Sequence, residues 1–92
     1  MMLEQLKFLA CHIFKVSREQ LDGKSRKIEV VYAKIAMTKY LHAQGYKLVD
    51  IAGMVNMNHS TITHYLQTFD DRFKYDSKFR KLYEQFEQEC NE

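Results

Sequence analysis

One short stretch of the chain concentrates hydroxyl, imidazole and amide side chains and carries no lysine or carboxylate. Its polar residues are His59, Ser60, Thr61, Thr63, His64, Gln67 and Thr68. Lys and Glu are better helix formers than Ser and Thr, so a merely solvated helix would more often carry them. Hydroxyls contact any DNA base, a Thr methyl packs on the thymine methyl, and Gln pairs with adenine. The stretch therefore indicates a surface that reads base edges, although Ser60 and Thr61 could equally cap a helix.

These polar residues lie on one side of an expected helix from His59 to Phe69. Apolar residues recur there at helical spacing, at Ile62, Tyr65, Leu66 and Phe69. We expect Asp70-Asp71 to close this helix and a connection to run to Tyr75. The same spacing predicts a helix over Leu48–Val55, which residues 56–58 join to the helix that begins at His59. Two short amphipathic helices with so tight a connection are typical of a helix-turn-helix, whose second helix enters the major groove.

The charge of the chain is unevenly distributed. The net charge is only +2, but residues 24–47 carry six basic residues against one acidic residue, a balance of +5. Residues 70–92 have a balance of −2. A basic segment in a nearly neutral protein indicates a phosphate-binding side, and it also fits a solvated helix face.

The rest of the chain predicts further helices. The 92 residues are 46% hydrophobic and include no proline and three glycines, which favours long helices over strands. The expected helices cover Leu3–Val16, Arg18–Leu21 after a Ser17 cap, Lys27–His42 ended by a left-handed Gly45, and a last aromatic helix of about 76–90 capped by Asp76 or Ser77. We therefore predict one all-α domain over residues 1–92, a small helical bundle of five or six helices.

Several classes of function find no support in the sequence. No His or Cys pair has the close spacing of a zinc site, and Cys11 and Cys90 are too few for a disulfide framework. No segment resembles a membrane span or a signal peptide. We expect a cytoplasmic protein with reduced thiols that is not an enzyme and needs no cofactor or metal.

Four segments occur in the order and spacing found in the C-terminal DNA-binding domain of the bacterial replication initiator DnaA. They are Gly23-Lys24-Ser25-Arg26-Lys27, Ile35-Ala36-Met37, Leu48-Val49-Asp50-Ile51 and Asn58-His59-Ser60-Thr61-Ile62-Thr63-His64. The chain resembles that domain over about residues 5–70, which implies a fold similar to it and to Trp repressor. It lacks the Gly-rich phosphate loop that the initiator's nucleotide-binding domain would need.

The resemblance implies roles for particular residues. In that family the segment around His59 opens the recognition helix and reads the major groove, and an arginine similar to Arg26 enters the minor groove. Asn58 stands where the family has an aspartate and retains the ability to cap the helix and contact a base. The expected base contacts are therefore Arg26, Asn58, His59, Ser60, Thr61, Thr63 and His64. The expected phosphate contacts are Lys24, Lys27, Lys34 and Lys47.

The sequence thus predicts sequence-specific binding of double-stranded DNA, in replication control, in transcription control or in a mobile element or phage. A homodimer on a palindromic site is an alternative assembly, with the last helix pairing with a second copy. An alternative function is a protein-interaction adaptor that uses the aromatic last helix. A third is an RNA- or single-strand-binding module in which Tyr and Phe stack on bases.

Overall fold

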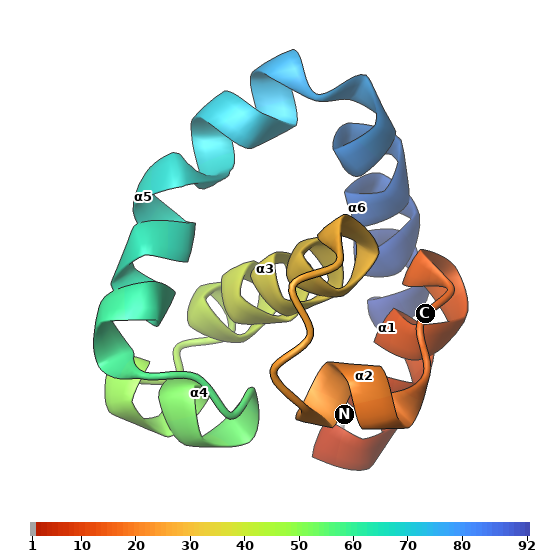
Figure 1. Ribbon diagram of the computed structural model, residues 1–92. Coiled ribbons are helices and arrows are strands. Elements are labelled where there is room, and N and C mark those ends of the chain that lie inside the picture. Colours follow the sequence, from red (N-terminus) through yellow and green to blue (C-terminus); the bar gives the residue numbers. More distant parts are fainter. Residues whose placement is uncertain (1) are drawn as a thin grey trace.

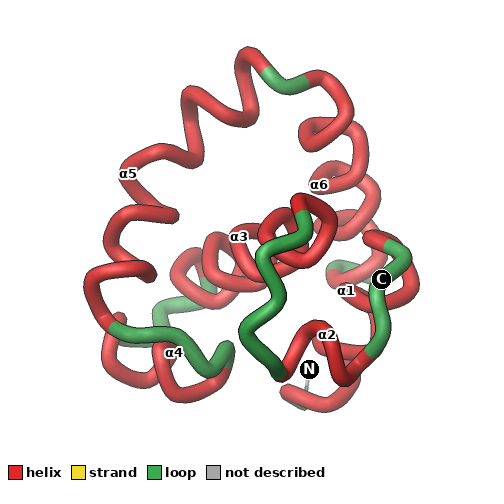
Figure 2. Tube along the Cα trace, in the orientation of Figure 1, coloured by secondary structure: helices red, strands yellow, loops and turns green. Residues whose placement is uncertain are grey.

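Six helices form within residues 2–92, which are the residues that the computed structural model describes, and these residues contain no strand (Figures 1 and 2). The helices are α1 (Leu3–Phe14), α2 (Arg18–Asp22), α3 (Ile28–Ala43), α4 (Leu48–Met54), α5 (His59–Tyr75) and α6 (Ser77–Cys90). The predicted all-α fold, a small helical bundle, is confirmed. None of the helices described combines the length and the apolar character needed to cross a lipid bilayer.

Helix α3 runs through the middle of the bundle (Figure 1). Nine of its sixteen residues are buried, and they lie on nearly every side of the helix. Each of the other five helices packs against it. A helix that is apolar around most of its circumference is stable only inside a protein, so α3 forms the centre of the core.

The boundaries of the helices follow local signals. The Ser17 hydroxyl accepts a hydrogen bond from the Gln20 amide at the start of α2. Gly45 ends the turn after α3 with a φ of +96°, a left-handed conformation that glycine adopts at no steric cost. The Asp76 carboxylate accepts a hydrogen bond from the Phe79 amide and caps α6. These three predicted boundaries are confirmed.

Helix α5 is longer than predicted, because it continues through Asp70-Asp71 to Tyr75. The expectation of a connection over 70–75 is wrong. No Gly or Pro interrupts this segment, and the half-buried Phe73 extends the apolar stripe by another turn. The Phe73 ring stacks on Phe69, with centroids 5.7 Å apart, and meets the edge of Tyr83 at 6.1 Å. Packing against α6 therefore keeps the second half of α5 helical.

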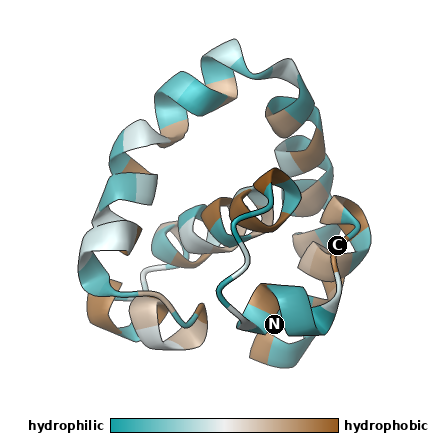
Figure 3. Cartoon of the chain, in the orientation of Figure 1, coloured by the Kyte–Doolittle hydropathy of each residue, from teal (hydrophilic) through white to brown (hydrophobic). Residues whose placement is uncertain are grey.

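The aromatic stripe of α6 belongs to the core. Phe79, Tyr83 and Phe86 are no more than 4% exposed. Rings from α1, α3 and α5 surround them, with Phe14 6.1 Å from Phe86 and Tyr32 5.2 Å from Phe79. Figure 3 shows hydrophobic residues along both α3 and α6. The stripe is not free to bind a second copy or a partner, which removes the surface on which the dimer and adaptor alternatives depended.

Replacing Asp76 by alanine tests the junction between α5 and α6. The Asp76 carboxylate also accepts a hydrogen bond from the Tyr32 hydroxyl of α3. Loss of the cap and of this bond should lower the free energy of unfolding by about 1–2 kcal/mol at pH 7, measured by urea denaturation.

The effect of this substitution should depend on pH. Hydrogen bonds from Tyr32 and from the Phe79 amide hold the pKa of Asp76 below its usual value. Stability from such a carboxylate is present above its unfolded-state pKa and is lost as the pH falls through the lower folded-state pKa. The difference between parent and Asp76→Ala should therefore shrink below about pH 4. Equal stability at pH 7 would contradict the assignment.

Candidate nucleic-acid interface

The first turn of α5 is organised by the side chain of Asn58. Its Oδ1 atom accepts hydrogen bonds from the Thr61 amide, the Thr61 hydroxyl and the Ser60 hydroxyl, each at 2.8 Å. Asn58 has extended backbone angles and therefore stands in the N-cap position. Ser60 and Thr61 do not cap the helix themselves, as one reading of the sequence allowed, but donate to the residue that does.

The other two threonine hydroxyls of α5 also direct their hydrogens toward the helix backbone. Thr63 Oγ1 lies 3.1 Å from the His59 carbonyl oxygen, and Thr68 Oγ1 lies 2.9 Å from that of His64. A carbonyl oxygen only accepts, so each threonine hydroxyl is the donor. With Ser60 and Thr61, four hydroxyls thus leave oxygen lone pairs for an outside partner. The serine and threonine hydroxyls of this helix therefore act as hydrogen-bond acceptors toward an outside partner.

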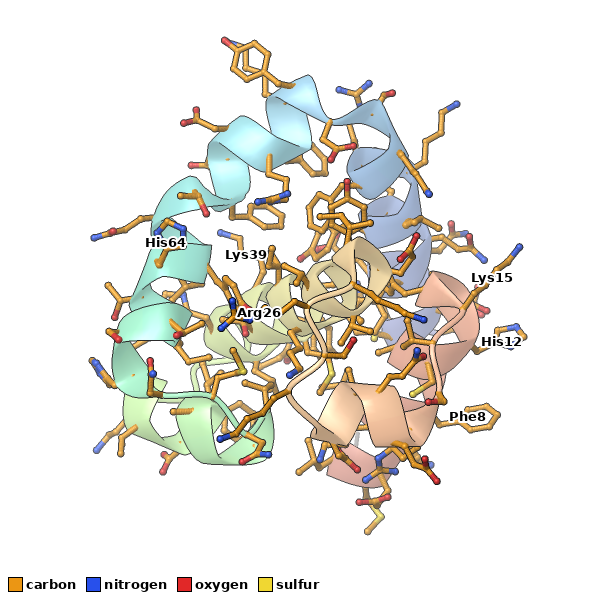
Figure 4. The ribbon with its side chains drawn as sticks, in the orientation of Figure 1. Phe8, His12, Lys15, Arg26, Lys39 and His64 are labelled. Atoms are coloured by element: carbon orange, nitrogen blue, oxygen red, sulfur yellow. The ribbon has the colours of Figure 1, made fainter. Side chains whose placement is uncertain are left out.

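The polar face of α5 points away from the core. We use this name for Asn58, His59, Ser60, Thr61, Thr63, His64, Gln67 and Thr68. Its asparagine, serine, glutamine and two histidines are exposed, and its three threonines are half-buried. The opposite side, with Ile62, Tyr65 and Phe69, is buried. Figure 4 shows His64 on the outer side of α5, as the helical spacing predicts.

The basic loop, residues 24–27, connects α2 to α3 and approaches the start of α5. A cleft of about 600 Å³ separates them. Its lining consists of Lys24, Ser25 and Arg26 from the loop, Val31 and Lys34 from α3, Asn56, Met57 and Asn58 from the turn before α5, and Tyr65 from α5. Arg26 is exposed and lies on the side of the molecule that faces α5 (Figure 4). The loop and the start of the polar face therefore share one side of the protein.

Lys34 is the exception among the predicted phosphate contacts. Its side chain is only 2% exposed. The ammonium donates to the Gly23 carbonyl at 2.8 Å and lies 3.5 Å from the sulfur of Met57. Burial lowers the pKa of Lys34, and the charge of Asp22 opposes that shift. An ammonium used in this way inside the protein does not reach a phosphate, so the predicted role of Lys34 is wrong.

The other predicted cations are exposed but not all adjacent. Lys24 lines the cleft, whereas Lys27 precedes α3 and Lys47 precedes α4, and neither of these two lines it. Sequence reasoning missed Asn56, which has a φ of +55° and donates from Nδ2 to the Asp22 carbonyl at 2.9 Å. Its signal is the residue type, because Asn tolerates the left-handed region and bonds backbone in turns.

Comparison with known proteins gives one partial match. The chain is 36% identical over 69 residues to "Chromosomal replication initiator protein DnaA" of Pseudothermotoga lettingae. These residues are 74% of this chain and 16% of that protein, so the chain spans about a sixth of the relative's length. No family model and no solved structure matches the chain.

Replacing Asn58 by alanine tests the organisation of the first turn. The variant loses the acceptor of three hydrogen bonds, and we expect the free energy of unfolding to fall by about 1 kcal/mol. Asn58→Asp is the matched control, because a carboxylate caps a helix equally well and should preserve stability. Thermal or urea denaturation measures both. An alanine variant as stable as the aspartate variant would show that Asn58 does not hold this turn.

Proposed function

We propose that this chain binds double-stranded DNA, with α5 in the major groove and the basic loop in the adjacent minor groove. The observation that carries the proposal is the shared cleft, which brings Arg26 beside the cap of α5. Helices α4 and α5, joined by residues 55–58, then act as a helix-turn-helix. The similarity over 69 residues to a replication initiator supports DNA binding and favours a role in replication.

The polar face of α5 supplies the base contacts in this proposal. They come from Asn58, His59, Ser60, Thr61, Thr63 and His64. Because its hydroxyl oxygens are free only as acceptors, they suit the amino groups of adenine and cytosine. A threonine also brings a methyl group, which packs on the methyl of the thymine paired with adenine. We therefore expect A·T pairs opposite the threonines.

Cations around this face supply the phosphate contacts. Lys24, Lys27 and Lys47 are exposed and carry no ion pair in the described residues 2–92. Phosphate contacts position a protein on the duplex and strengthen binding to every sequence, whereas base contacts provide the discrimination. Arg26 differs from the lysines, because its guanidinium suits the narrow, negative minor groove of A·T-rich DNA.

Selection of bound duplexes from a random pool tests the function directly. The proposal expects one enriched motif that contains A·T pairs, with an affinity that falls steeply as salt rises. Recovery of no motif, together with equal binding at low and high salt, would refute DNA binding. Preference for unpaired strands in a competition assay would instead favour the single-strand alternative.

Alanine substitutions of Arg26 and His59 test the two groove contacts. Each should weaken binding to the selected duplex by about 1–3 kcal/mol while the protein stays folded. His12→Ala is the control, because His12 is an exposed histidine of α1 and lies on the opposite side of the molecule from His64 in Figure 4. Fluorescence anisotropy measures affinity, and circular dichroism checks the fold. Parent-like binding by both groove variants would reject this reading surface.

Alanine substitutions of Lys24 and Lys47 test the phosphate contacts. Each should weaken binding to all sequences alike and reduce the slope of log affinity against log salt by about one. Lys15→Asn is the control, because it removes one positive charge at the end of α1, away from the proposed interface. Asparagine tolerates the left-handed backbone conformation of Lys15. An unchanged slope for Lys24→Ala and Lys47→Ala, or an equal change for Lys15→Asn, would remove these lysines from the interface.

A further inference from the structure

We propose that Lys34 and Asn56 form a clamp that fixes the basic loop relative to the start of α5, so that both groove-reading elements keep a set spacing. The clamp consists of two hydrogen bonds, from Lys34 Nζ to the Gly23 carbonyl and from Asn56 Nδ2 to the Asp22 carbonyl. Both residues are positioning residues in this view. The consequence for DNA rests on the function proposed above, whereas the clamp itself does not.

The two acceptors are carbonyls at the end of α2. The last carbonyls of a helix have no partner within the helix, so they need donors from elsewhere. Here one donor comes from α3 and the other from the turn that precedes α5. A positive group is also favourable at a helix C-terminus. The end of α2, where the basic loop begins, is thereby attached to the turn that leads into α5, and the two loops lie side by side in Figure 2.

Further contacts hold the residues that carry the two acceptor carbonyls. The Asp22 carboxylate pairs with Lys7 of α1 at 3.1 Å and with Arg18 at 2.8 Å. A Cβ atom on Gly23 would lie 2.9 Å from the Glu19 carbonyl oxygen, so a side chain at this position would force the backbone at the end of α2 to shift. The start of the basic loop is therefore fixed on α1 and α2.

Burial and backbone conformation position the two donor side chains, Lys34 and Asn56. Lys34 projects from the buried centre of the bundle, and its ammonium also lies beside the sulfur of Met57 in the turn. The backbone of Asn56, in the same turn, has a left-handed conformation. Burying an ammonium is unfavourable unless it is hydrogen-bonded, and an apolar side chain would occupy the same space without that cost. A lysine here is best explained by the contact that its ammonium makes.

The clamp lies within a few residues of both reading elements. Arg26 follows Gly23 by three residues along the loop, and the cap residue Asn58 follows Asn56 by two. Fixing both before DNA arrives removes the entropic cost of ordering them on binding. It also sets the separation of the base pairs that α5 and Arg26 can contact together. The clamp therefore predicts a strict spacing between the two parts of the DNA site.

Two variants remove the clamp bonds with little other change. Lys34→Met keeps an unbranched side chain in the buried position but removes the donor. Asn56→Gly keeps the left-handed backbone accessible and removes the side-chain amide. Lys39→Met is the matched control, because Lys39 is also on α3 but its ammonium lies over the Phe69 ring, 4.9 Å from its centre.

Amide hydrogen exchange tests the clamp without DNA. We expect the amides of Gly23 and Met57, which donate to the Glu19 and Ala52 carbonyls in the parent, to exchange about tenfold faster in each clamp variant, while α1 and α6 exchange as in the parent, because only the local opening equilibrium changes. Lys39→Met should leave the exchange of both amides unchanged. Parent-like exchange of both amides in both folded variants would overturn the clamp whatever the chain binds. If Lys34→Met does not fold, Asn56→Gly decides the question.

Binding to duplexes of altered spacing tests the consequence. The probes are the selected duplex and two versions with one base pair added or removed between the segments contacted by α5 and by Arg26. The parent should prefer the original spacing by about tenfold or more, and clamp variants should bind the original more weakly and discriminate less than about threefold. A general loss of stability would weaken all three duplexes alike.

The outcomes separate the two proposals. Clamp variants that retain the parent's spacing preference, or a Lys39→Met variant that loses it, would overturn the spacing role while DNA binding stands. A parent protein that selects no duplex would overturn the proposed function, and hydrogen exchange would still decide whether the clamp exists.

Discussion

A helix that is buried on nearly every side must have its polar groups satisfied by its neighbours, and in this protein α3 is that helix. Its two buried polar side chains are Lys34 and Thr38. The Thr38 hydroxyl donates to the Lys34 carbonyl of its own helix at 2.8 Å, whereas the Lys34 ammonium finds its acceptor at the end of α2. The end of α2, where the basic loop begins, is thus hydrogen-bonded to a side chain of the buried central helix.

Helix α5 connects the proposed interface to the core. Its first half presents the polar face, and its second half packs Phe69 and Phe73 against α6. At its C-terminal end, Asp76 accepts hydrogen bonds from α3 and from the first turn of α6. A rigid helix anchored in this way holds its exposed end in a defined orientation, which groove recognition requires.

Charge is divided between the two proposed contact elements. The basic loop carries exposed cations, while the polar face of α5 contains no lysine, arginine or carboxylate and has its serine and threonine hydroxyl hydrogens bonded within the protein. Cations give affinity for any duplex, and oriented acceptors give preference among bases. This arrangement explains how a chain with a net charge of only +2 could bind a polyanion.

Local patterns in the sequence determined the helical type and most boundaries of the elements, and limited their number to five or six. Period and capping chemistry act within a few residues, as Ser17, Gly45 and Asp76 illustrate. The same locality explains the orientation of the polar face of α5. The length of α5 was decided instead by contacts of Phe73 with a helix that follows it. The hydrogen bonds from Lys34 to Gly23 and from Asn56 to Asp22 likewise join residues that are 11 and 34 positions apart. Only the tertiary structure brings such partners together.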